Sequence, residues 1–222
     1  INIDQIVQQY TYLHKEGYPI DDKVTKLANL YKKVNYLPTS VTTNLFGKDR
    51  SNHIKSLIFN YEKENPVGMK SNVKAWASDY HTHLQTDIFS NYLNLILQYS
   101  QNLYNKLFST EEILEIGEFW VAHYRRGEFT VKHNHGNLLD DFIISGCYYA
   151  YVEDNASPII FDGQKPVHPK NDSLVLFSPQ TEHEVPPTDG ERIIMSFNIR
   201  KTKKTQLTTD EYKNLANFIS NM

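Results

Sequence analysis

Beyond residue 110, the apolar residues of the chain recur at every second position in short runs. The runs are rich in aromatic and β-branched side chains, and Gly, Pro, Asn and Asp residues separate them. A period of two is typical of β-strands, because successive side chains point to opposite faces. The runs cover residues 115–124, 143–152, 157–163, 172–179 and 191–199. Several short strands with no helix between them predict an antiparallel sandwich, jelly roll or barrel.

Helical spacing dominates the first 110 residues and the C-terminal tail. The predicted elements are helices near 3–13, 24–34 and 88–107, a strand at 40–46, and a helix capped by Asp49 or Ser51. We therefore expect a mainly β chain with flanking helices, an α+β protein with a jelly-roll core. The predicted regions are an N-terminal helical region (1–68), the core with a long supporting helix (69–205) and a C-terminal helix (206–222).

Composition excludes several classes of function. The net charge is −3 and the longest basic run, 201–204, is short, so a basic surface for nucleic acid is not indicated. No apolar run approaches the roughly 18 residues of a membrane span, and the chain does not begin like a signal peptide. The single cysteine, Cys147, cannot form an internal disulfide, which suits a reducing compartment. We expect a soluble cytoplasmic protein that binds neither nucleic acid nor membrane.

Residues 124–135 carry the first candidate site, in the sequence YRRGEFTVKHNH. His133 and His135 stand two residues apart, so a strand would place both imidazoles on one face. A third histidine, His183, follows an apolar strand and a Ser-Pro turn, where it begins the next strand. Three protein ligands with open positions suit a metal that binds substrate and oxygen, and imidazole suits iron, copper, zinc and nickel. For each histidine alone, a solvent-facing position is the competing interpretation.

Arg192 lies nine residues after His183, at the head of the strand RIIMSFNI. It shares one strand face with Ile194, Ser196 and Asn198. Arginine offers a planar fork that matches a carboxylate, and an unpaired buried charge is costly. An inward-facing Arg192 therefore indicates an anionic partner, such as a dicarboxylate cosubstrate.

These residues stand in a pattern that extends over roughly 71–200. Its members are Tyr124, Gly127, His133, His135, Ser145, Gly146, Tyr148, Tyr149, Leu176, Phe177, His183, Val185, Pro187, Arg192, Ser196, Phe197 and Asn198. The pattern resembles the 2-oxoglutarate/iron(II)-dependent oxygenases, in particular a branch found in marine bacteria and phages that is distantly similar to prolyl 4-hydroxylases. The first seventy residues carry no motif of that family.

The resemblance implies a double-stranded β-helix and hydroxylation of a substrate with release of succinate and carbon dioxide. It implies that His133 and His183 bind Fe(II) and that Arg192 pairs with the far carboxylate of 2-oxoglutarate. We expect Tyr124, Ser196 and Asn198 to lie in the same cosubstrate site. The substrate is either a peptidyl residue or a small metabolite. The expected cytoplasmic location includes the case of a phage-encoded protein that is expressed in a bacterial cytoplasm. The N-terminal helices would cover the barrel mouth, form a homodimer interface or bind a protein target.

The sequence departs from the family at the third metal ligand, where the usual carboxylate is His135. Either the site has three histidines, which we favour, or an acid such as Asp140 or Asp141 completes it. Two other functions stay open: a cupin-like three-histidine dioxygenase without 2-oxoglutarate, and a non-catalytic jelly-roll binding module. Residues given no role in the metal site are His53, His81, His83, His123, His168, Trp120, Tyr148 and Tyr149, the last three expected in the core or the pocket wall.

Overall fold

The computed structural model describes residues 37–135 and 142–202. Two sheets face each other, and the neighbouring strands that pair within each sheet are antiparallel. In spatial order the large sheet contains β1 (Ser40–Thr43), β8 (Ser173–Phe177), β6 (Phe142–Val152), β10 (Arg192–Lys201), β4 (Leu114–Tyr124) and β3 (Trp76–Ala77). The small sheet contains β2 (Val73–Lys74), β5 (Phe129–His133), β9 (His183–Val185) and β7 (Ile160–Phe161). The predicted jelly-roll architecture is confirmed.

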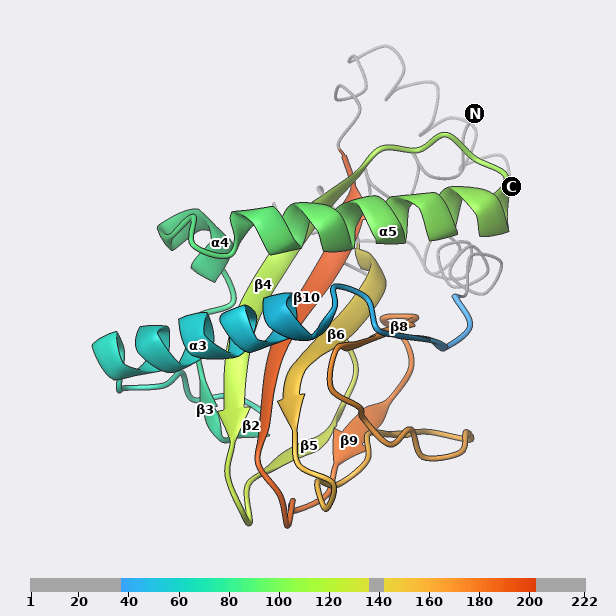
Figure 1. Cartoon of the computed structure of the whole chain (residues 1–222). Coiled ribbons are helices and arrows are strands. Elements are labelled where there is room, and N and C mark those ends of the chain that lie inside the picture. The colour runs from blue at the N-terminus through green and yellow to red at the C-terminus, as the bar shows by residue number, and fades with distance from the viewer. Residues whose placement is uncertain (1–36, 136–141, 203–222) are drawn as a thin grey trace, which may run out of the picture.

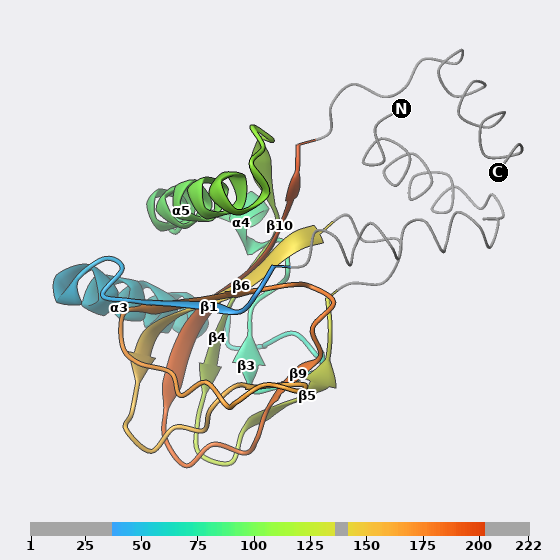
Figure 2. The same cartoon turned by 90° about the vertical axis from the view of Figure 1, so that its right-hand side faces the viewer.

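The helices cover the face of the large sheet that is turned away from the small sheet (Figures 1 and 2). They are α3 (Lys48–Glu64), the short α4 (Thr82–Gln85) and α5 (Ser90–Phe108). Ile54 and Ile58 of α3 and Ile96 of α5 are fully buried against the sheet. The helical spacing therefore predicted these two long helices correctly, because it marks the stripe that packs on the sheet.

The start of α3 differs from the prediction. Gly47 occupies the N-cap position, and no side chain caps the helix. Ser51 lies inside the helix, where its hydroxyl donates a hydrogen bond to the backbone oxygen of Ala150 on β6 at 2.8 Å. Asp49 lies in the first turn. The polar side chain taken for a cap instead attaches the helix to the sheet.

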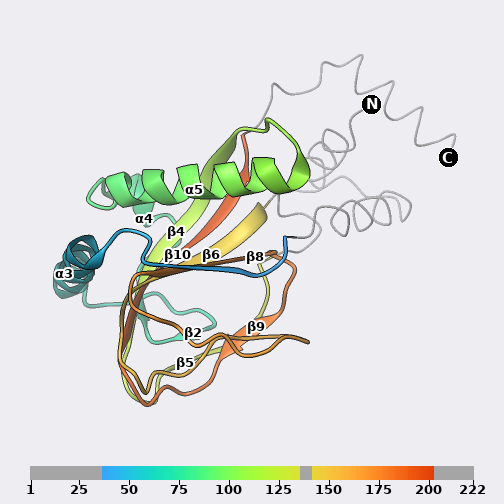
Figure 3. The same ribbon diagram turned by 45° about the vertical axis from the view of Figure 1, so that its right-hand side comes forward.

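Strand β10 shows how the alternation builds two cores. Ile193, Met195 and Phe197 pack with the helices, whereas Ile194 packs between the two sheets. Figure 3 shows the space between the sheets, with β5 and β9 opposite the long strands of the large sheet. The inward face of β10 therefore points at the strands that carry His133 and His183.

The helices predicted at 3–13, 24–34 and 206–222, and also Asp140 and Asp141, lie outside the described residues. Within the described part of the chain, no helix is long and apolar enough to cross a membrane.

Candidate metal centre

The three histidines lie on the small sheet and just beyond it. His133 is the last residue of β5 and is paired in register with His183, the first residue of β9. His135 lies past the end of β5, so the expectation that one strand carries both His133 and His135 is wrong. The backbone N–H of His135 donates to the oxygen of Pro179 at 2.8 Å, which holds this residue against the turn before β9.

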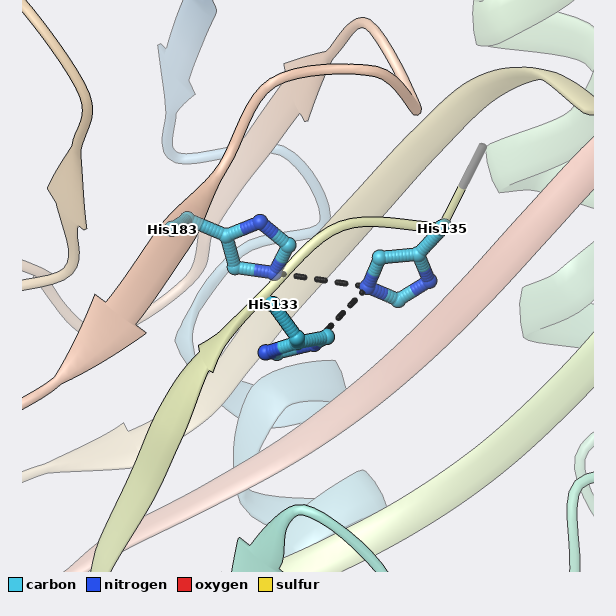
Figure 4. A group of neighbouring side chains, drawn as sticks. All are labelled: His133, His135 and His183. Atoms are coloured by element: carbon cyan, nitrogen blue, oxygen red, sulfur yellow. Dashed lines mark hydrogen bonds between the residues drawn. The ribbon is translucent and has the colours of Figure 1, made fainter. Parts of the chain in front are cut away.

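The imidazoles nevertheless converge on one point, as Figure 4 shows. Nε2 of His135 lies 3.1 Å from Nε2 of His133 and 3.3 Å from Nε2 of His183. One nitrogen from each ring falls within 4.8 Å of the others. Nitrogen ligands about 2.1 Å from a shared metal stand roughly 3.0–3.4 Å apart at octahedral or tetrahedral angles. The two separations from His135 fit that requirement.

Backbone oxygens set the orientation of two rings. Nδ1 of His133 donates to the oxygen of Val131 at 2.8 Å, and Nδ1 of His183 donates to the oxygen of Thr181 at 3.0 Å. The proton of each neutral ring is thereby placed on Nδ1, which leaves the Nε2 lone pair free for a metal. The ring of His135 has a side-chain hydrogen bond to Asn198 and stacks on Trp120, with centroids 5.8 Å apart.

Burial keeps these imidazoles neutral. It lowers the pKa of His183 to about 4, with a further contribution from nearby His133. The pKa of His135 lies well below the usual value because of burial and then its two histidine neighbours, and burial also lowers the pKa of His133. A metal binds the neutral ring, so the three ligand atoms are available at neutral pH without proton release.

Two cavities adjoin the histidine triad: all three histidines line the inner one, and His133 and His135 also line the outer one. The inner one, about 40 Å³, is lined among others by Tyr124, Thr130, Cys147 and Ser196. The outer one is more open, at about 300 Å³, and reaches Glu118, Phe142 and Asn198. The inner cavity has room for only a few water molecules in this arrangement, so a five-carbon diacid requires its walls to move.

Arg192 lies behind the inner cavity. Its side chain is 1 % exposed, and its guanidinium stands 4.7 Å from the ring centre of Tyr124 and 5.3 Å from that of Tyr149. Its only hydrogen bond among the described residues is from Nη1 to the oxygen of Ser157, at 3.2 Å. Nε is buried without a partner, and no carboxylate of the described residues pairs with the guanidinium. A buried cation in this condition fits an anionic ligand.

The other predicted cosubstrate residues fall on both sides of the triad. Tyr124 donates or accepts a hydrogen bond with Thr130 at 2.7 Å, and Ser196 lines the inner cavity. Asn198 lies toward the outer cavity, where it donates to Glu118 at 2.7 Å and accepts from Ser145 at 2.6 Å. The structure thus connects Asn198 to His135, a contact that the strand face alone did not indicate.

Trp120, Tyr148 and Tyr149 are buried, in the core or the pocket wall as expected, but they face different sides of the large sheet. Trp120 and Tyr149 face the space between the sheets, whereas Tyr148 faces the helices and donates to Asp172 at 2.9 Å. His123 is not one of the three clustered histidines, but it forms a cluster of its own that the sequence did not reveal. It is buried between Glu62 and Glu191, each 2.6 Å from a ring nitrogen. Its partners lie 61 and 68 residues away in the sequence, so no local motif could have predicted these contacts.

No family model matches the chain, and no curated protein matches it significantly. Solved structures do match. A Pseudomonas putida prolyl-4-hydroxylase aligns with a TM-score of 0.60 at 20% identity, over 74% of this chain and 93% of that chain. A Trichoplax adhaerens prolyl hydroxylase in complex with a hypoxia inducible factor peptide aligns with a TM-score of 0.55 at 15% identity, over 82% and 94%. The fold is that of the prolyl-4-hydroxylase-like oxygenases.

A third structure, HygX from Streptomyces hygroscopicus, contains nickel and 2-oxoglutarate. It aligns with a TM-score of 0.55 at 11% identity, over 81% of this chain and 88% of that chain. The double-stranded β-helix expected from the sequence is therefore the fold that these proteins share with this chain.

Proposed function

We propose that the chain is an Fe(II)- and 2-oxoglutarate-dependent oxygenase that hydroxylates a peptidyl residue or a small metabolite and releases succinate and carbon dioxide. One arrangement carries the proposal. Three neutral imidazoles converge beside an inner cavity, and a buried arginine without a carboxylate partner stands behind that cavity. The fold neighbours include prolyl hydroxylases and a protein with bound 2-oxoglutarate, which supports the same function.

Each group of this chain has a distinct task in the proposal. His133, His135 and His183 hold the metal through Nε2, and the oxygens of Val131 and Thr181 orient two of the rings. Arg192 attracts the far carboxylate of 2-oxoglutarate. Tyr124, Thr130 and Ser196 line the cavity between the metal and this arginine. Fe(II), 2-oxoglutarate and dioxygen together supply oxidative decarboxylation of the 2-oxo acid coupled to substrate hydroxylation. His183 is buried, whereas His133 and His135 are half-buried and line the outer cavity, so the bound substrate would have to exclude water from that side.

A three-histidine dioxygenase that needs no 2-oxo acid is the second candidate. Two observations favour it: His135 takes the place of the usual carboxylate, and the inner cavity is small. Arg192 opposes it, because an enzyme without a dicarboxylate has no use for a buried and unpaired cation.

An anaerobic titration tests the proposal. Fe(II) is added to the apoprotein, then 2-oxoglutarate, and the visible charge-transfer absorbance of a chelated 2-oxo acid is recorded. Dioxygen is then admitted and succinate is measured. Absorbance and succinate together support the proposal. Oxygen consumption without succinate supports the second candidate.

A binding module is the remaining alternative. It gains support if no absorbance develops and if His133→Ala and His183→Ala change nothing that can be measured. Two further expectations from the sequence have tests of their own. Limited proteolysis tests the region boundaries near 68 and 205, and light scattering tests the homodimer.

A further inference from the structure

The charges around the triad are separated along one pair of strands. Arg192 is paired in register with Tyr124 at one end of the β4–β10 ladder, and Asn198 is paired with Glu118 six residues further on. Six residues of strand span about 20 Å. The metal site lies between these levels, because His133 and His135 line both the inner and the outer cavity. The cation therefore stands at the inner end and the carboxylate at the outer end.

Glu118 is the only carboxylate among the described residues that line the outer cavity, and no lysine or arginine of those residues lines it. One of its oxygens accepts from Nδ2 of Asn198 at 2.7 Å, and Asn198 is 1 % exposed. No lysine or arginine of the described residues forms an ion pair with Glu118. The carboxylate is thus held in place without being neutralised.

Aromatic rings stand beside that carboxylate. Tyr80 and Trp120 meet edge to face, with centroids 5.0 Å apart and planes at 78°, and Phe142 completes the apolar wall. A ring face within about 6 Å attracts a cation, and a carboxylate beside it adds direct charge pairing. The cavity, about 300 Å³, has the size of a small ligand or one long side chain.

We propose that the outer cavity binds the substrate through a protonated amine, with Glu118 as its specificity-determining residue. This inference rests on the proposed function for the identity of the cavity as the substrate site. Fe(II) and 2-oxoglutarate carry opposite formal charges of two, so they cancel once both are bound. Glu118 is then the charge that an incoming ligand meets, and an alkylammonium group is complementary to it. The amine belongs either to a free small molecule or to a lysine side chain.

Calorimetry on the anaerobic protein loaded with Fe(II) and 2-oxoglutarate tests the inference. The probes are n-butylammonium, n-pentanol and butyrate, which are similar in length and differ in charge, and an Ala-Lys-Ala peptide with an Ala-Leu-Ala control. We expect n-butylammonium to bind at least about tenfold more tightly than n-pentanol, and butyrate not to bind. Tight binding of the lysine peptide points to a peptidyl source, and binding of the free amine alone points to a small molecule.

The substitution Glu118→Gln keeps an oxygen that accepts from Asn198 and removes the charge. It should reduce the preference for n-butylammonium over n-pentanol by about tenfold, whereas Glu115→Gln should not. Glu115 is the matched control: it lies on the same strand, pairs with Arg200 at 2.7 Å and does not line the cavity. Equal binding of the three small probes, or equal behaviour of the two variants, overturns the inference.

The two proposals fail separately. Charge-transfer absorbance without any preference for amines leaves the oxygenase proposal intact and overturns this one. If no absorbance develops, the same titration on the protein without metal still measures whether the cavity prefers a cation.

Discussion

Arg192 combines nearly complete burial, two aromatic neighbours and a guanidinium Nε without a partner. Such a group costs stability unless a ligand pairs with it. Tyr124 and Thr130 close the space between this arginine and the histidines. At the scale of the residue, Arg192 is therefore where 2-oxoglutarate should be recognised.

Replacing Arg192 by Met should weaken 2-oxoglutarate binding about 10- to 100-fold, because a charge-assisted hydrogen-bond pair is lost. Fe(II) affinity should stay nearly unchanged, since none of the histidines touches Arg192. The measurement is the anaerobic charge-transfer titration for wild type and variant. Unchanged 2-oxoglutarate affinity would argue for the three-histidine enzyme without a 2-oxo acid.

His183 makes the metal-free protein sensitive to acid. Its folded-state pKa of about 4 lies below its ordinary value, because burial disfavours the charged ring. As the pH falls below about 6.5, the unfolded chain binds a proton that the folded chain does not, so stability declines until about pH 4. The free energy of unfolding in urea should fall between pH 7 and pH 4.5 in both proteins. The fall should be about 2–3 kcal/mol smaller in His183→Asn than in wild type. An equal loss in both proteins would contradict this assignment.

At the scale of the element, His123 connects α3 to the sheet. Glu62 of α3 and Glu191 before β10 each lie 2.6 Å from its ring, and Arg125 also reaches Glu62 at 2.6 Å. Burial raises the pKa of Glu62, but its bonds to His123 and Arg125 outweigh this and lower the pKa overall. The cluster links the helical layer to the end of the β4–β10 pair at which Arg192 lies.

His123→Leu should destabilise the protein by about 2–4 kcal/mol, because it leaves two partly buried carboxylates without their shared partner. His53→Leu is the control. His53 also has a short bond, 2.6 Å to the hydroxyl of Tyr92, but that contact is exposed and should change stability by less than about 0.5 kcal/mol. Urea unfolding at pH 7 gives the free energy of unfolding of both variants. Similar losses of that free energy would show that the carboxylate cluster does not stabilise the fold more than an exposed contact does.

The sequence predicted the strands and helices that are long enough to show a periodic pattern of apolar residues. Long strands such as β4 and β10 and the helices α3 and α5 each repeat their apolar pattern over several turns or pleats. It did not reveal β2 and β3, since two residues cannot show an alternation. The family resemblance brought His133 and His183 together in the prediction. Their pairing in register and the contacts of Asn198 with Glu118 and His135 depend on long-range geometry.

At the scale of the whole molecule, residues 37–135 and 142–202 form three layers: helices, the large sheet and the small sheet (Figure 2). The small sheet and the segment after β5 carry the three histidines proposed as metal ligands, and the large sheet provides Trp120 and Asn198 behind His135. A metal at the triad would link β5, β9 and the segment at His135. Metal binding should therefore stabilise the entire fold.

Co(II), a redox-stable substitute for Fe(II), should raise the melting temperature by about 5–10 °C at one hundred times its dissociation constant. This follows from about 2.7 kcal/mol of binding linkage at that concentration. His183→Ala should abolish the increase, whereas the surface variant His168→Ala should retain it. Differential scanning calorimetry measures both, and an unchanged melting temperature in wild type would contradict a metal site at the triad.

The most direct measurement is anomalous diffraction at the iron edge from crystals grown anaerobically with Fe(II). The three-histidine centre predicts one peak about 2.0–2.2 Å from Nε2 of His133, His135 and His183. A peak bound by His133, His183 and a carboxylate, with the ring of His135 turned away, would contradict the assignment of His135. The absence of any peak at the triad would contradict the metal centre itself.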